Sequence, residues 1–163
     1  MKRILTALVL GISLLVASGG GGYSQDYQKG LEAAQKGDLA TALREWSALA
    51  EQGHVGAQYN LGVMYENGEG VTQDYKEAVK WYRKSAEQGT ASAQYNLGLI
   101  YTIGQGVLQD DVYTHMWWNI AASNGYADAV KARDIVAKRM TTEQLAEAHK
   151  LARECVRKKY KGC

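Results

Sequence analysis

The fold is decided by two stretches of this chain, GHVGAQYNLG at residues 53–62 and GTASAQYNLG at residues 89–98. The same shift of 36 residues places Trp81 over Trp117 and Gly70-Val71 over Gly106-Val107. Self-similarity at a fixed period of about 20–50 residues is the signature of a repeat protein, in which successive units stack on one another. The sequence therefore predicts one repeat at residues 53–88 and a second at residues 89–124.

Each repeat is expected to be a helix hairpin. Small and aromatic side chains recur every three or four residues, as Ala57, Leu61 and Tyr65 in the first half and Ala78, Trp81, Tyr82, Ser85 and Ala86 in the second. This spacing lays one stripe along a helix. Glycines in residues 68–71 permit a left-handed helix exit, and Asp74 and Asp110 can cap the second helices. Neither hairpin buries its stripe alone, so the prediction is all-α, an α/α superhelical solenoid of antiparallel helix hairpins.

The flanking segments fit as end pieces of this solenoid. Residues 25–52 contain a degenerate N-terminal hairpin with a tight turn at residues 36–38, and Ala42, Trp46 and Ala50 precede equivalent positions by 36 residues. Residues 125–163 are expected to form capping helices followed by a basic tail. Thr141 and Gln144 have the spacing of a capping box, which marks the start of the last helix.

The repeat motif resembles that of the Sel-one-like repeat family, a relative of the tetratricopeptide repeat. The family pattern is present as Ala57, Leu61-Gly62, Tyr65, Gly68-Glu69-Gly70-Val71, Asp74, Ala78, Trp81-Tyr82, Ala86 and Gly89, and again in the second copy. The second copy departs at Thr114, where the motif has Ala, and at Trp118, where it has Tyr, so looser packing is expected there. The resemblance implies a superhelical scaffold that holds protein partners, often in envelope or signalling complexes.

The first residues have the pattern of a secretory signal. Met1-Lys2-Arg3 is basic, residues 4–16 are mostly apolar, and small residues follow at 17–22. The apolar run is shorter than the ~20 residues that cross a bilayer as a helix, which favours a cleaved signal peptide over residues 1–24. Cleavage after Ser24 and cleavage after Gly19 are both compatible with the pattern. The expected location is periplasmic or secreted.

Charge is distributed unevenly along the 163 residues. Residues 25–130 contain 7 basic and 13 acidic side chains, whereas residues 131–163 contain 10 and 4. The basic tail either complements the dipole of the last helix or contacts an anionic partner or lipid headgroups. The acidic part also offers a surface for the tail of another copy, which is a route to self-association. No nucleic-acid partner is expected for an exported protein.

The chain contains none of the usual catalytic or phosphate-binding motifs, so no enzymatic activity and no cofactor are expected. Its histidines, His54, His115 and His149, are scattered, and no metal site is expected. Two other functions remain open. One is hydrolysis or binding of cell-wall material or β-lactams, as associated with Cys-rich relatives that have a bridge in every repeat. The other is a secreted effector or inhibitor.

Two cysteines, Cys155 and Cys163, stand near the end of the chain. On one unbroken helix their Cα atoms would lie about 12 Å apart, beyond the ~7 Å that a disulfide tolerates. An intrachain bond therefore requires the helix to end first, near Tyr160 or Gly162. A link between chains and free thiols are the alternatives.

The predicted ligand-contacting residues lie on the first helix of each repeat. First helices line the concave side of tetratricopeptide-like solenoids, so side chains off the packing stripe are the expected contact set: Gln58, Tyr59, Asn60 and Val63, and Gln94, Tyr95, Asn96 and Leu99. Tyr supplies contact area at low entropic cost, and Asn can hydrogen-bond a peptide backbone. The alternative is that the tyrosines pack between repeats and the asparagines join adjacent helices.

Overall fold

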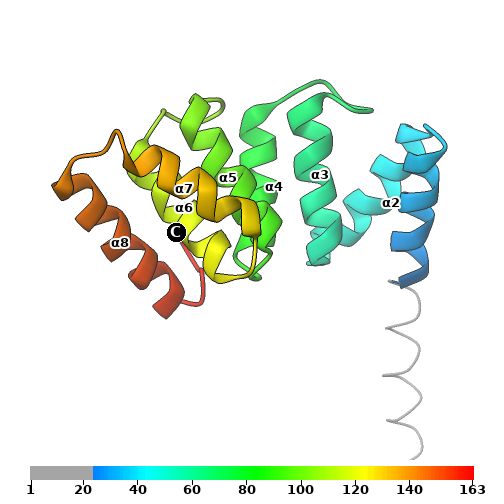
Figure 1. Cartoon of the computed structure of the whole chain (residues 1–163). Coiled ribbons are helices and arrows are strands. Elements are labelled where there is room, and N and C mark those ends of the chain that lie inside the picture. Colours follow the sequence, from blue (N-terminus) through cyan, green and yellow to red (C-terminus); the bar gives the residue numbers. More distant parts are fainter. Residues whose placement is uncertain (1–23) are drawn as a thin grey trace, which may run out of the picture.

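The computed structural model describes residues 24–163, and all regular structure in this range is helical (Figure 1). The predicted signal peptide lies outside the described residues, except for Ser24. A helix over 24–35 is followed by α2 (Leu39–Glu51), α3 (Val55–Asn67), α4 (Tyr75–Ala86), α5 (Ala91–Ile103), α6 (Asp111–Ser123), α7 (Ala127–Ala137) and α8 (Thr142–Arg157). None of these helices combines the length and apolar character needed to cross a membrane.

The helices stack in the order predicted from the repeats (Figure 1). Helix α3 packs on α4 and α5 packs on α6, which makes each repeat a hairpin. Contacts of α2 with α3, α4 with α5 and α6 with α7 join successive hairpins. The buried apolar side chains form three clusters along this stack, and the predicted helical solenoid is confirmed.

The ends of the helices form as the sequence predicts. The Asp74 carboxylate accepts from two backbone N–H groups at the start of α4, and Asp110 does the same at the start of α6. Gly68 and Gly104 end α3 and α5 in the left-handed region, with φ of 72° and 71°. These φ values favour glycine because it has no Cβ. The Thr141–Gln144 capping box is present at α8.

In each hairpin a glycine of the first helix receives an aromatic ring from the second. A Cβ added at Gly62 would lie 2.5 Å from the Tyr82 ring, and one at Gly98 would lie less than 3.0 Å from the Trp118 ring. The same contact joins Gly30 and Trp46 in the N-terminal hairpin. Close approach of the two helices therefore depends on the absence of a side chain at these glycines.

The second repeat is not loosely packed where it departs from the family motif. Thr114 is fully buried, and its hydroxyl accepts a hydrogen bond from the Thr102 hydroxyl at 3.3 Å. Trp118 is also buried, and its Nε1 donates to the Tyr95 carbonyl at 3.0 Å. The expectation of looser packing is wrong, because each larger side chain has a polar partner on α5.

The C-terminal helix folds back on the second repeat. Helix α8 packs against α6 and buries Ala148, Ala152 and Cys155 there. It ends at Arg157, and Lys159 and Tyr160 adopt left-handed φ of 53° and 65°. This turn brings the Cα atoms of Cys155 and Cys163 to 5.6 Å, and the two residues form an intrachain disulfide. Of the three alternatives for the cysteines, the structure contains this one.

Candidate functional site

Gln58 is buried at the junction between the N-terminal hairpin and the first repeat. Its Nε2 donates to the Ala50 carbonyl at 3.1 Å. Its Oε1 accepts from Gln88 Nε2 at 2.7 Å. The side chain therefore satisfies the end of α2 and binds the end of α4, which removes Gln58 from the exposed contact set predicted from the sequence.

The next junction repeats this arrangement with the equivalent residues. Gln94 is fully buried, and its Nε2 donates to the Ala86 carbonyl at 3.2 Å. Asn124 Nδ2 donates to Gln94 Oε1 at 2.8 Å. Gln94 is likewise unavailable to a ligand. Gln58 and Gln94 each link two hairpins through the same pair of hydrogen bonds, and we call this repeated arrangement the glutamine ladder. The sequence pattern does not reveal it, because these side chains are polar but buried.

Tyr59 is a half-buried residue of α3 whose ring packs against α4. Its ring centroid is 5.8 Å from that of Tyr82, in a tilted arrangement. Burial raises the pKa of the Tyr59 hydroxyl, and the nearby Tyr126 raises it further, while the polar side chains of Asn96 and Ser92 oppose the shift. The hydroxyl therefore stays protonated.

The Tyr95 ring stacks on Tyr126 with centroids 4.6 Å apart, and on Trp118 at 5.9 Å. Burial raises the pKa of Tyr95, followed by the effects of Tyr126 and Asp128. This ring fills the boundary between the second repeat and α7. Both tyrosines thus pack between hairpins, which is the alternative to ligand contact given in the sequence analysis. Each also keeps part of its surface exposed.

Asn60 joins adjacent hairpins rather than standing free. Its Nδ2 donates to the Tyr27 hydroxyl at 3.3 Å, and the Tyr27 ring stacks on His54 at 4.6 Å. Tyr27 precedes Tyr59 by 32 residues because the turn after the helix over 24–35 is shorter than the glycine loop of the repeats. A comparison at a fixed shift of 36 residues therefore misses Tyr27.

The remaining candidates, Val63 and Leu99, belong to an apolar row. Both are partly buried on the first helices of their repeats. Leu31 holds the equivalent place at the 32-residue spacing of the first hairpin, and Ile135 holds it on α7. Ile135 is 66% exposed. We call residues 31, 63, 99 and 135 the apolar row.

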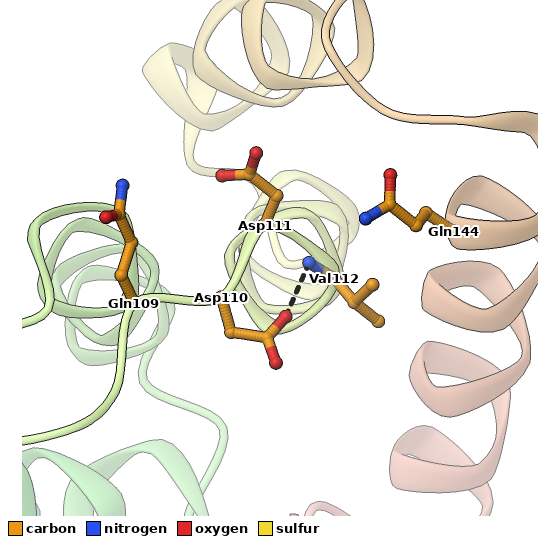
Figure 2. A pocket seen from close by; sticks show the side chains of 5 residues that line it. All are labelled: Gln109, Asp110, Asp111, Val112 and Gln144. Carbon is orange, nitrogen blue, oxygen red and sulfur yellow. Dashed lines mark hydrogen bonds between the residues drawn. The ribbon is translucent and has the colours of Figure 1, made fainter.

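A cavity of about 420 Å³ opens at the start of α6, lined by Gln109, Asp110, Asp111, Val112 and Gln144 (Figure 2). Three of its polar side chains already have partners. Asp110 accepts from Val112 N at 2.8 Å, Asp111 pairs with Arg139 through two hydrogen bonds, and Gln144 accepts from Thr141 N. Asp110 caps α6, as predicted, and Asp111 is paired with Arg139, so this cavity is not the preferred site.

Two of the three histidines, which are far apart in the sequence, lie together in space. The rings of His115 on α6 and His149 on α8 meet edge to face with centroids 5.0 Å apart. His115 is buried, and burial, followed by His149 and Arg133, lowers its pKa to about 4. Over residues 24–163 no three His, Cys, Asp or Glu side chains converge as a metal site requires.

Comparisons with known proteins agree with this architecture. The Sel1 repeat family model matches residues 55–90 and 91–126, two residues later than the repeat boundaries predicted from the sequence. Over 56 residues, the chain is 39% identical to an exopolysaccharide production negative regulator of Rhizobium leguminosarum bv. viciae. The aligned segment covers 34% of this chain and 21% of that protein.

Two solved structures are also similar. One is a protective antigen of uropathogenic Escherichia coli strains displaying an SLR fold, with a TM-score of 0.81 and 31% identity over 88% of this chain and 31% of that chain. The other is a Sel1 repeat protein from Oxalobacter formigenes, with a TM-score of 0.52 and 40% identity over 54% and 35%. The chain spans about a third or less of each relative. Its repeats, helix caps and stacking place it among the Sel1-like repeat proteins.

Proposed function

We propose that this chain is an exported, non-enzymatic scaffold that holds a protein or peptide partner along its first helices α3, α5 and α7. Sel1 repeats generally mediate protein–protein interactions. The observation that carries the proposal is the apolar row, because equivalent positions on successive helices keep apolar surface exposed and Ile135 is the most exposed of them.

The side chains next to the apolar row supply polar contacts. Tyr59 and Asn96 lie beside one another at the boundary of the two repeats, and each is partly exposed. A partner segment that crosses α3, α5 and α7 would place apolar side chains on residues 63, 99 and 135. Its backbone amides would face Asn96 and the Tyr59 hydroxyl, groups suited to reading an extended peptide.

Site-specific photo-crosslinking tests this proposal. A photoreactive residue is placed at Asn96 or Ile135 in the full chain, and Leu108 serves as the matched control because it is 89% exposed but lies outside the apolar row. We expect a discrete crosslinked protein from positions 96 and 135 in intact cells, and its loss when Leu99→Arg is added. Equal crosslinking from position 108, or adducts unaffected by Leu99→Arg, would show that the apolar row is not the partner-binding surface.

Export is proposed from the pattern of the first 24 residues. Fractionation of cells that express the full chain, followed by N-terminal sequencing, tests it. We expect a shortened protein outside the cytoplasm that begins near residue 20 or residue 25. An intact Met1 in the cytoplasmic fraction would contradict export without affecting the partner-binding surface.

A further inference from the structure

The end of the chain concentrates positive charge. Residues 150–163 contain six basic side chains and one acidic side chain, Glu154. Lys150 pairs with Glu147, and Lys161 pairs with Glu87. The other four, which we call the basic corner, are exposed and form no ion pair with any residue over 24–163; they are Arg153, Arg157, Lys158 and Lys159.

The basic corner is fixed to the body of the protein. The disulfide joins Cys155 on α8 to Cys163 at the end of the turn, and the Tyr160 hydroxyl donates to Asn124 Oδ1 at 3.1 Å. Gly162 N donates to Glu87 Oε1 at 3.2 Å. Left-handed backbone at Lys159 and Tyr160 is unfavourable for residues with a Cβ, so these tertiary contacts hold the turn in place. The segment is an ordered turn, whereas a frayed helix end would lack them.

The helix dipole accounts for Arg157 and Lys158 at the end of α8 but not for Arg153 and Lys159. Cations near a helix C-terminus are favourable only within the last turn. Arg153 lies a turn before the end of α8, and Lys159 lies beyond it. Helix α8 buries Ala152 and Cys155 against the second repeat, so Arg153 and Arg157 point away from the protein. Val156, 47% exposed, adds apolar surface next to them.

We propose that the basic corner docks on an anionic lipid bilayer. Guanidinium and ammonium groups on a convex helix face and turn can meet several headgroup phosphates at once. A second copy of the chain is a poorer match, because the acidic side chains over 24–130 are largely engaged. Five are in ion pairs, at Asp26, Glu45, Glu77, Glu87 and Asp111, and three cap helices, at Asp38, Asp74 and Asp110.

Vesicle binding of the full chain tests the proposal. Vesicles of phosphatidylglycerol and phosphatidylcholine are compared with vesicles of phosphatidylcholine alone. The basic Lys2 and Arg3 and the apolar residues 4–16 are the same in the wild type and in both variants, so their contribution does not distinguish the proteins. The test variant is R153Q/R157Q/K158Q/K159Q. The matched control K36Q/R44Q/K76Q/K80Q removes the same charge from exposed positions outside α8 and the basic corner. Circular dichroism checks that both variants keep the helical content of the wild type.

Each basic residue near an anionic membrane surface contributes about fivefold to partitioning. We expect the test variant to lose on the order of 100-fold or more in binding to anionic vesicles, while the control variant binds nearly as the wild type. The wild-type preference should also decline as salt is raised above about 0.1 M. Equal losses in both variants would overturn the proposal, since net charge alone would then explain binding. No preference of the wild type for anionic vesicles would also overturn it and leave an acidic protein as the partner.

Discussion

Replacing Gly98 with alanine tests whether the glycine–aromatic contact holds each hairpin together. The substitution gains about 1 kcal/mol of helix propensity. It also places a methyl group against the buried Trp118 ring, less than 3.0 Å from its nearest atom. Overpacking of a core costs about 1–3 kcal/mol, and displacement of the ring endangers the Trp118–Tyr95 hydrogen bond, worth about 1 kcal/mol. We expect a net destabilisation of about 1–3 kcal/mol.

The free energy of unfolding is measured by urea denaturation, with circular dichroism and tryptophan fluorescence as the two signals that report the transition. Gly56→Ala is the matched control, because the nearest atom to its added Cβ is the hydroxyl end of Tyr27, a partly exposed side chain that can move. We expect the control to be neutral or slightly stabilising. A Gly98→Ala variant as stable as wild type, or as stable as the control, would refute the role assigned to the contact.

Three further outcomes are expected. Cys155→Ser/Cys163→Ser removes the disulfide over 8 residues of separation and should cost about 2 kcal/mol in chemical denaturation, whereas unchanged stability would show that the bond constrains nothing. Asp110→Ala should cost about 1 kcal/mol by removing the α6 cap, and Asp110→Asn should restore most of it. The pKa of His115 is lowered from 6.5 to about 4, so between these two pH values the imidazole is protonated only in the unfolded chain. The free energy of unfolding should therefore fall as the pH decreases from 6.5 towards 4. The His115→Gln variant should lack this fall, and an identical pH dependence of both proteins between pH 6.5 and 5 would contradict it.

The helices and their ends could be predicted because they depend on local spacing. Ala57, Leu61 and Tyr65 recur on one face, and Asp74 and Gly68 act on backbone groups a few residues away. Such signals lie within a single repeat and recur in the next. The repeat alignment also predicts the stacking, since each hairpin leaves an apolar face that only another hairpin covers.

The surface was predicted less completely, because side-chain availability depends on the neighbouring hairpin. Gln58 and Gln94 carry polar side chains at positions that periodicity places off the packing stripe, yet the preceding helix end buries them. The contribution of Ile135 was missed because α7 lacks the family motif. His115 and His149 meet only because α8 turns back on α6, and no local pattern encodes that packing.

The glutamine ladder makes the boundaries between hairpins chemically interchangeable. Gln58 and Gln94 each bond to a carbonyl at the end of the preceding helix and accept from an amide at the end of the following one. A duplicated segment 53–88 inserted after residue 88 would meet matching donors and acceptors on both sides. The protein is therefore expected to tolerate elongation by whole units, so that gene duplication can lengthen the array without a new interface having to evolve.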